Sequence, residues 1–426
     1  MAMLAVWLVL CFVLASVFAS RPVWLLSAAI IIRILVPFYA SNAWMVGLHM
    51  AGYLVAATAI MQVILYRPRV VRVLLNSKAE LALFSVLVIL MMVNSVSAYS
   101  SIIETLMNLA IIYLTPFALY LLLKMEIHRL GLRAIQVISV PFHLTMLYQL
   151  WLAMRQKETG ELLVYEQYSQ QTVWFQTTEE VGRSYGTLES GLELATLCIF
   201  AVAMTYWVKN SLLRVLLIVA YLYTGLLSNG RAAVVISIMV AVAVLLLARA
   251  GLASKIASGV IGLISGGFLY LSEAGQELIS KVNDDGGSNQ KRFDALTWVS
   301  NNFQHFIMTG YPGDRDLRAS GQLSSSLENA YLIAAMGYGL IFSAVLLALQ
   351  FFIVIRNMRS ASAVVMGLAA LGIIAVNMTN SGFTTNSTSA YLLWIALGLC
   401  SVGTWISTSG YQAPIDKRLN RVSSVS

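Results

Sequence analysis

Residues 211–247 read SLLRVLLIVAYLYTGLLSNGRAAVVISIMVAVAVLLL. Two almost wholly apolar runs, 211–228 and 232–249, flank a turn of a few residues that ends at Arg231. Each run approaches the length of about 20 residues that an α-helix needs to cross the hydrocarbon core of a bilayer. Since a turn this short joins neighbouring antiparallel helices, the stretch predicts a transmembrane helical hairpin.

The rest of the chain repeats this pattern. Of its 426 residues, 59% are hydrophobic and only 11% are charged, whereas a soluble domain is about one-quarter charged. The mean hydropathy is +0.79. At about 20 residues per span, an apolar share of this size gives room for about 12 or 13 spans. The composition excludes a soluble enzyme, a disordered protein and a single-span receptor with a large ectodomain. It predicts an all-α fold, a polytopic bundle of membrane helices.

Thirteen apolar runs are long enough to be spans. They lie at 3–20, 23–40, 45–66, 79–98, 102–123, 134–153, 188–208, 211–228, 232–249, 256–272, 330–355, 361–378 and 389–407. We expect them to divide the chain into N-terminal transmembrane helices (1–154), a periplasmic loop (155–187), central transmembrane helices (188–272), a long periplasmic loop (273–328), C-terminal transmembrane helices (329–410) and a cytoplasmic tail (411–426). Within the long loop, residues 292–307 predict an amphipathic helix at the outer mouth of the bundle.

Basic residues collect in the loops on alternate sides of this bundle. They follow the odd-numbered runs: Arg67, Arg69, Arg72 and Lys78 after the third, Lys124, Arg129 and Arg133 after the fifth, Lys209 and Arg214 after the seventh, Arg249 and Lys255 after the ninth, Arg356 and Arg359 after the eleventh, and Lys417, Arg418 and Arg421 after the last. By the positive-inside rule these loops are cytoplasmic, and the even-numbered runs end outside. Because this placement accounts for the formal charge of +8, nucleic acid is not an expected partner.

No metal or cofactor motif is visible in the sequence. The three cysteines lie in apolar runs without C-x-x-C spacing, and the four histidines lack metal-ligand spacing. Asp314-Arg315-Asp316 forms the D-x-D motif of many nucleotide-sugar transferases, but the predicted topology turns it outward, away from nucleotide sugars. Gly-rich phosphate loops, dinucleotide fingerprints and the G-x-S-x-G elbow are absent. We therefore expect neither a cofactor nor a metal ion.

Four polar segments converge on the outward-facing side of the predicted bundle, at 182–189, 227–233, 291–298 and 327–331. Arg231 is expected at headgroup depth, where it either snorkels to hold the helix end or binds an anion together with the backbone N–H groups that begin the helix. Arg183 has the same two interpretations, the structural one being a salt bridge with Glu179 or Glu180. Arg292 is either a further anion ligand or part of a solvated face.

Charged side chains near these segments are candidates for proton transfer or transport. Glu328, at the head of a predicted span, is the candidate general base, or alternatively a charge favoured by the helix dipole. Glu189 and Glu193 are four residues apart on one helix face, which is the spacing of a buried polar pair. Arg33 lies in the middle of run 23–40 and is a functional candidate because intramembrane charges are costly. Its position favours a transporter.

Polar and aromatic residues beside these charges are candidates for sugar binding. Tyr185, Trp298 and Tyr311 present rings that stack on sugar faces, although aromatic residues also gather at membrane interfaces. Asn329 and Tyr331 follow the candidate base directly. We expect these five residues to contact the substrate.

Taken in order, these motifs resemble those of bacterial O-antigen ligases and O-antigen or exopolysaccharide polymerases. The shared features are Arg-x-x-Gly at 183–186, a Ser-Asn-Gly-Arg turn before small residues at 228–233, an Arg followed by Trp and then Gly-Tyr at Arg292, Trp298 and Gly310-Tyr311, and Glu-Asn-x-Tyr-Leu at 328–332. The resemblance covers about residues 180–345.

The resemblance implies a metal-independent glycosyltransferase of the bacterial inner membrane that uses a polyprenyl-diphosphate-linked glycan at the periplasmic face. It implies that Arg183, Arg231 and Arg292 hold the diphosphate, and a chain-length regulator is an expected partner. Lipopolysaccharide ligases carry a histidine where this chain has Glu328. That difference favours a polymerase, which transfers the glycan to a sugar hydroxyl of a lipid-linked repeat unit, over a ligase that uses a lipid A-core acceptor. The alternative from another class is a lipid-linked oligosaccharide flippase.

Overall fold

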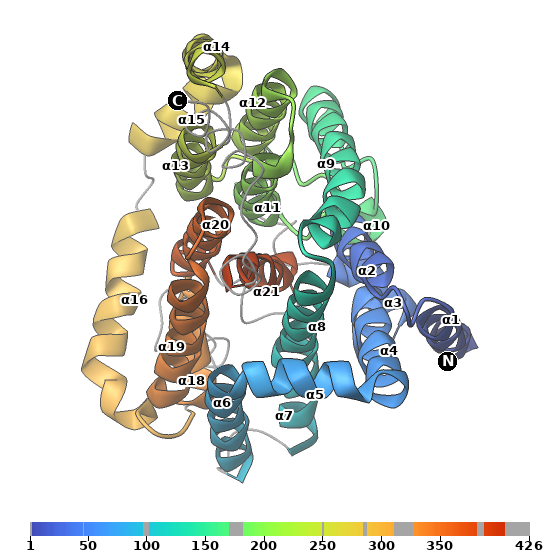
Figure 1. The fold of residues 1–426 in the computed structure, drawn as a ribbon. Helices are drawn as coiled ribbons and strands as arrows, with labels where there is room; N and C mark the ends of the chain where they lie inside the picture. Colours follow the sequence, from blue (N-terminus) through green and yellow to red (C-terminus); the bar gives the residue numbers. More distant parts are fainter. Residues whose placement is uncertain are drawn as a thin grey trace, which may run out of the picture.

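The computed structural model describes residues 2–45, 47–96, 102–169, 182–248, 251–283, 288–310, 327–380 and 387–404. Within these ranges every regular element is helical (Figure 1). The elements are α1 (Ala2–Val17), α2 (Val23–Leu35), α3 (Phe38–Trp44), α4 (Met50–Leu65), α5 (Arg67–Asn76), α6 (Lys78–Val96), α7 (Ile102–Asn108), η1 (Leu109–Leu114), α8 (Thr115–Leu130), α9 (Leu132–Thr159), α10 (Glu166–Ser169), α11 (Gly191–Met204), η2 (Thr205–Trp207), α12 (Ser211–Leu227), α13 (Arg231–Leu247), α14 (Leu252–Leu271), α15 (Glu273–Asn283), α16 (Ser288–Asn302), η3 (Phe303–Phe306), α18 (Ala330–Tyr338), α19 (Leu340–Asn357), α20 (Ala361–Asn377) and α21 (Thr388–Cys400).

Two short helices, α11 and α21, form the centre of the bundle. Every residue of α21 is buried, and so is every residue of α11 except Leu192. Both sequences are apolar around the whole helix, which is typical of a helix enclosed by others. Helix α20 packs on both of them, α8 packs on α21, and α12 and α13 pack on α11. These surrounding helices position the site residues described below.

The outer surface of the bundle carries large apolar side chains. Leu263, Ile355 and Val6 are 80%, 73% and 69% exposed, which is the surface of a protein that faces lipid. Among the described residues, three helical stretches (Ile102–Leu130, Leu132–Thr159 and Leu340–Asn357) are long and apolar enough to cross a membrane, and two bent helix pairs bring the number to five. Seven further apolar helices in this part of the chain are shorter. The predicted all-helical class is confirmed for the described residues, and its apolar helices are compatible with several membrane spans.

Two predicted runs bend sharply near their ends. Run 23–40 is broken between α2 and α3, which meet at 104°, and α4 meets α5 at 107°. A proline stands at each break, Pro37 as the N-cap of α3 and Pro68 in the first turn of α5. Proline begins a helix readily but cannot continue one. Helix α5 therefore lies crosswise between α4 and α6 and also packs on α8 (Figure 1).

The prediction of one continuous span at 330–355 is wrong. Gly339 adopts φ +95°, a left-handed conformation that suits glycine, and the chain folds back there into a hairpin of α18 and α19. The Tyr331 hydroxyl donates a hydrogen bond of 2.7 Å to Gln350 Oε1. In one straight helix these two residues would lie about 28 Å apart along the axis. Helix α18 is thus a short helix packed on α19.

The predicted fifth run also ends later than expected. Helix α8 continues to Leu130, so Lys124 and Arg129 lie in the helix rather than in a loop. Lys124 Nζ lies 2.8 Å from Glu80 Oε1 near the start of α6, and Arg356 Nη1, at the end of α19, lies 3.2 Å from Glu80 Oε2. Three elements that the positive-inside rule assigns to one side therefore meet at one end of the bundle.

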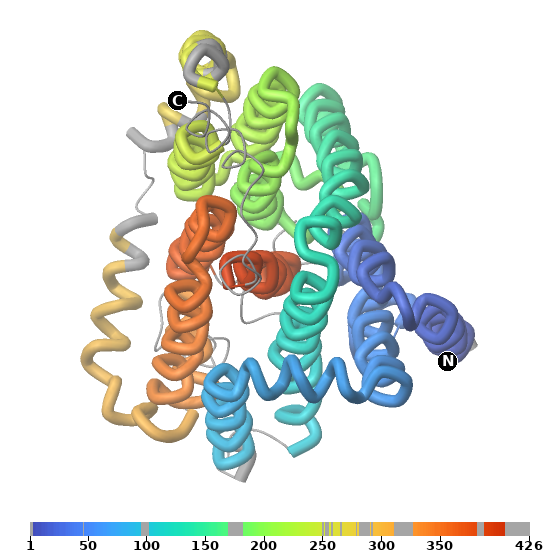
Figure 2. The backbone as a smooth tube through the Cα atoms, viewed as in Figure 1, coloured from blue at the N-terminus to red at the C-terminus, as the bar shows by residue number. Residues whose placement is uncertain are grey.

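The segment predicted as a long loop contains helices. The expected amphipathic helix at 292–307 is α16 followed by η3, which together cover 288–306. Ala295 and Val299 of α16 pack against Ala335 and Met336 of α18. Figure 2 shows α16 at one edge of the molecule and α1 at the opposite edge. Residues 284–287 and 311–326 of the predicted loop 273–328 lie outside the described residues.

Candidate functional site

The segment before α11 is held in an extended path along α9 by two glutamines. Gln156 Oε1 accepts hydrogen bonds from the backbone N–H groups of Tyr185 and Gly186, both at 2.9 Å, and Gln149 Oε1 accepts one from the Thr187 N–H. The Ser184 hydroxyl donates to the Ala153 carbonyl at 2.8 Å. Buried backbone groups need such partners, so these side chains replace a strand or helix ladder and fix the segment that carries Arg183.

This segment touches the turn that carries Arg231. The Ser184 N–H donates to the Leu227 carbonyl at 3.1 Å. A Cβ on Gly191 would lie 2.9 Å from the Ser228 carbonyl oxygen and 3.2 Å from the Arg183 Cβ, so the two segments meet over this glycine. The prediction that 182–189 and 227–233 converge is therefore met in the geometry of the backbone.

The backbone conformation and the packing of the turn before α13 explain which residues occupy it. Asn229 adopts φ +58°, a left-handed conformation that asparagine tolerates better than most side chains. A Cβ on Gly230 would lie 2.3 Å from the Ala195 Cβ, so only glycine lets the turn approach α11. Arg231 then opens α13 as its first residue, partly exposed. The backbone N–H groups of this first helical turn are the ones that lack partners within the helix.

A carboxylate from a distant helix joins the same place. Glu277 of α15 lies with Oε2 2.7 Å from Lys157 Nζ of α9 and with Oε1 3.0 Å from Asn229 Nδ2. Arg183 and Lys157 both line a cavity of about 210 Å³ beside this junction. Sequence reasoning missed Lys157 and Glu277, since 120 residues separate them and no spacing rule links them.

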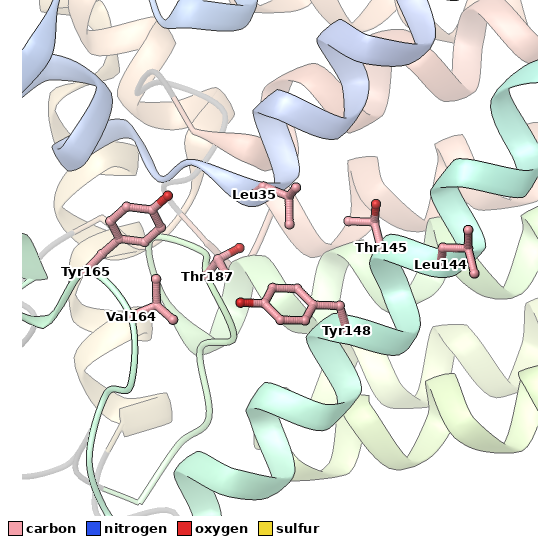
Figure 3. A pocket seen from close by; sticks show the side chains of 7 residues that line it. All are labelled: Leu35, Leu144, Thr145, Tyr148, Val164, Tyr165 and Thr187. Atoms are coloured by element: carbon pink, nitrogen blue, oxygen red, sulfur yellow. The ribbon is translucent and has the colours of Figure 1, made fainter.

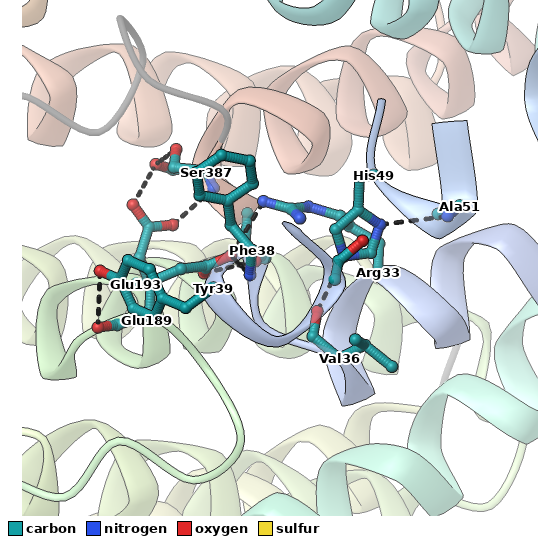
Figure 4. A network of polar contacts seen from close by, with 12 residues as sticks. Arg33, Val36, Phe38, Tyr39, His49, Ala51, Glu189, Glu193 and Ser387 are labelled. Carbon is teal, nitrogen blue, oxygen red and sulfur yellow. Dashed lines mark hydrogen bonds and ion pairs between the residues drawn. The ribbon is translucent and has the colours of Figure 1, made fainter. Parts of the chain in front are cut away.

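A second polar network lies under the same segment, deeper in the bundle (Figure 4). Glu189 Oε1 accepts hydrogen bonds from Arg33 Nη2 at 2.9 Å and from the Phe38 N–H at 3.0 Å, and Oε2 accepts one from the Thr388 hydroxyl at 2.8 Å. Arg33 and Glu189 are only 1% and 7% exposed. Arg33 lies in the last turn of α2, just before the bend, rather than in the middle of a span.

Glu193 completes this network from the first turn of α11, whereas Glu189 lies before that helix, next to its N-cap Ser190. The Glu193 carboxylate accepts hydrogen bonds from the N–H and the hydroxyl of Ser389, the latter at 2.8 Å. The N-termini of α3 and α21 therefore both point at glutamates, where the helix dipole favours negative charge. Glu189 and Glu193 are both buried, but the prediction that they share a face of one helix is wrong, because α11 begins only at Gly191.

A cavity of about 470 Å³ lies on the other side of the extended segment (Figure 3). Its lining residues come from α2, α9, the loop after α9 and the extended segment: Leu35, Leu144, Thr145, Tyr148, Val164, Tyr165 and Thr187. Most of these side chains are apolar or aromatic, with hydroxyl groups at the edges. The cavity suits a ligand with a hydrocarbon part.

The residues around Glu328 form a separate group. Asn329 is the N-cap of α18, and its Oδ1 accepts hydrogen bonds from the N–H groups of Tyr331 and Leu332 at 3.0 and 3.1 Å. The Ala330 N–H donates to the Asn380 carbonyl at 3.0 Å. Tyr331 is 4% exposed and bonded to Gln350 as described above. Glu328 is half-buried at the head of this helix.

The remaining predicted site residues are placed less fully. Trp298 of α16 is half-buried and packs against the apolar cluster between α16 and α18. Tyr185 is buried. Arg292 lies on α16, but its side chain is outside the description, and Tyr311 lies outside the described residues altogether. In the described part of the chain, no group of three or more His, Cys, Asp and Glu residues could hold a metal ion.

The segments 182–189 and 227–233, which carry Arg183 and Arg231 and are called the arginine segments below, lie at the opposite end of the bundle from the Glu80 ion pairs. Gly372, near the end of α20, packs on Ile236, near the start of α13, so Arg231 lies beside the C-terminal end of α20. The other end of α20 begins directly after Arg359. The Cys400 thiol at the end of α21 contacts the Ala363 carbonyl, whereas the start of α21 contacts Glu193.

Neither a protein-family model nor a curated protein sequence matches this chain. The functional interpretation therefore depends on the geometry above and on the sequence motifs.

Proposed function

We propose that the protein is a polysaccharide polymerase, a glycosyltransferase that transfers a polyprenyl-diphosphate-linked glycan onto a sugar hydroxyl of a lipid-linked repeat unit. In this proposal the chain crosses the bacterial inner membrane 12 or 13 times. The segment 273–328 and the arginine segments face the periplasm, as the distribution of basic residues favours.

One observation carries the proposal: the hydrogen bond from the Ser184 N–H to the Leu227 carbonyl joins the two arginine segments. Ser184 and Leu227 lie 43 positions apart in the sequence. The segments that carry Arg183 and Arg231 nevertheless share one end of the bundle. Two cationic side chains and the N-terminus of α13 are the elements of a diphosphate site.

The reaction requires little more than this set of groups. Cleavage of the anomeric C–O bond passes through an oxocarbenium-like state, and a diphosphate is already a good leaving group, so its departure needs charge stabilisation more than a proton. Each arginine contact to the diphosphate is worth about 1.5–3 kcal/mol. A base must accept the proton of the attacking hydroxyl, and Glu328 is the proposed base.

The position of Glu328 is compatible with this role. Its helix, α18, is tied to Asn380 at the end of α20, and the chain returns at Ser387 to begin α21 next to Glu193. The head of α18 therefore lies beside the C-terminal end of α20, where Arg231 also lies.

The test uses purified protein with a lipid-linked repeat unit as substrate and a gel ladder of glycan as readout. Arg183→Ala and Arg231→Ala should each lower polymer formation by at least tenfold, the factor expected from loss of about 1.4 kcal/mol or more. Arg155→Ala is the matched control. Arg155 lies at the end of α9 that carries Lys157, is 51% exposed, and pairs only with the exposed Glu158 in the described contacts. Normal ladders from both site variants at normal expression would refute the diphosphate role.

Two further experiments separate the alternatives. With a lipid A-core acceptor added to the reaction mixture, a ligase would extend that acceptor and leave repeat units unpolymerised. A flippase would leave both untouched, and deletion of its gene would strand repeat units on the inner leaflet. Arg33 is the residue that favours the flippase, but it lies in the last turn of α2, beside the bend between α2 and α3, and its pairing with Glu189 supports a structural role.

A further inference from the structure

A basic cavity lies at the end of the bundle opposite the arginine segments. It has a volume of about 450 Å³ and is enclosed by the end of α5, the end of α8, the end of α19 and the residues after it, and the last described residue. Its lining residues are Leu75, Asn76, Lys124, His128, Arg356, Asn357, Arg359 and Thr404.

The charge of this cavity is positive. Among the described residues, its lining has no acidic side chain, whereas Lys124, Arg356 and Arg359 line it. Glu80 is fully buried and is shared between Lys124 and Arg356, and Glu126, on the same helix as Lys124, pairs with Arg129. One carboxylate, Glu80, therefore balances the three cations of the lining. Like charges held together without enough counter-charge attract anions from the surroundings.

The surroundings of the cavity are those of a lipid-facing site. Helix α5 meets α4 at 107° and lies crosswise at the end of the bundle. Leu75, which lines the cavity, is 56% exposed, and Val71, one turn earlier on the same helix, is 42% exposed. A crosswise helix with exposed apolar residues beside basic ones is typical of the membrane interface. An amphipathic ligand would place its anionic head among the cations and its chains along Leu75.

We propose that this cavity binds the phosphate group of an anionic phospholipid. Basic pockets between membrane helices on the positively charged side of a protein recognise such head groups. The site is separate from the proposed diphosphate site, since the two lie at opposite ends of α20, and it does not depend on the polymerase assignment. Arg359 supplies an exposed guanidinium to the phosphate, and Lys124 and Arg356 supply the charge behind it.

The test measures lipid retained by the purified full-length protein, by native mass spectrometry, after incubation with phosphatidylglycerol or with phosphatidylcholine of the same acyl chains. The wild-type protein should retain phosphatidylglycerol in preference. Arg359→Gln should weaken that retention about tenfold, the loss of one charge-assisted contact. Arg67→Gln is the matched control. Arg67 is exposed at the start of α5, the helix whose other end lines the cavity, but Arg67 itself does not line the cavity. It should retain lipid like the wild type.

Three outcomes would overturn the proposal. Equal retention of the two lipids would exclude an anionic head group, and equal losses in Arg359→Gln and Arg67→Gln would assign the preference to the whole surface. The third uses glycerol phosphate and inorganic phosphate as soluble probes: if either raises the thermal unfolding temperature as much as phosphatidylglycerol does, the ligand is a soluble phosphate. Unfolding of Arg359→Gln without lipid is measured alongside and should equal that of the wild type.

Discussion

The two buried ion networks at opposite ends of the bundle have opposite charge balances. At the candidate functional site, Glu189 and Glu193 face one arginine, Arg33, and both carboxylates also accept hydrogen bonds from hydroxyls and from the N-termini of α3 and α21. At the other end, Glu80 alone faces Lys124 and Arg356. The comparison teaches that helix termini can hold an excess carboxylate inside the bundle, whereas at the cation-rich end Arg356 stays 36% exposed, where an anion can reach it.

The largest expected effect is at the Arg33–Glu189 pair. Glu189→Gln keeps the hydrogen-bonding shape but removes the carboxylate that lies 2.9 Å from Arg33, which is only 1% exposed, and leaves Glu193 as the remaining carboxylate of this network. Breaking a buried pair in this way costs about 3–5 kcal/mol, measured as the free energy of unfolding by denaturant in mixed micelles. The double variant Arg33→Met/Glu189→Gln should regain more than half of the loss. If it regains nothing, the charge balance is not what stabilises this end.

The corresponding change at the other end is expected to be smaller. Glu80→Gln leaves the buried Lys124 without its carboxylate and should cost about 3 kcal/mol, the lower limit for breaking a buried pair, because its other partner, Arg356, is 36% exposed and water already solvates part of that charge. Since the cavity becomes more positive, phosphatidylglycerol should restore part of this stability and phosphatidylcholine none. Unfolding in the two lipids gives the comparison. An equal loss in both lipids would contradict the charge argument for this end.

The turn next to the candidate site is expected to tolerate no added methyl group. In Gly230→Ala the new Cβ would lie 2.3 Å from the Ala195 Cβ, and overpacking of this kind costs about 1–3 kcal/mol. Gly266→Ala on α14 is the matched control, because nothing lies within 4 Å of its added Cβ and alanine favours a helix by about 1 kcal/mol. Thermal unfolding should separate the two variants, and equal midpoints would show that the turn is looser than described.

The smallest effect on stability is expected at Glu277. It and Lys157 are 28% and 30% exposed, so Glu277→Ala should change the free energy of unfolding by less than about 1 kcal/mol. Because Glu277 also holds Asn229 next to Arg231 and alanine removes that hydrogen bond, the variant should nevertheless reduce polymer formation. Assaying stability and product ladders in one preparation distinguishes a positioning role from a structural one. An unchanged product ladder would show that Glu277 does not position the residues of the candidate site.

Local features of the sequence predicted the helical class well, and the breaks within helices poorly. Apolar runs such as 211–228 predict a helix because continuous hydrophobicity and length are local properties. The fold-back at Gly339 was missed because a glycine within an apolar run is compatible with a straight helix as well. Contacts between α18 and α19, such as those of Tyr331 with Gln350 and with Ser343, reveal the hairpin.

The candidate site was predicted in part for the same reason. Arg183 and Arg231 were found because each stands in a short polar segment between apolar runs, and the predicted topology placed both segments at the same end. The roles of Gln149, Gln156 and Glu277 depend on side chains from distant helices meeting one segment, and no local pattern carries that information.

The most direct test of the account is a double-mutant cycle on the affinity of the purified protein for a polyprenyl diphosphate, with Arg183→Ala, Arg231→Ala and the double variant. The account predicts that each single variant binds at least tenfold more weakly, and that the double variant loses less than the two losses combined because both arginines hold one diphosphate. Wild-type affinity in both single variants would contradict it.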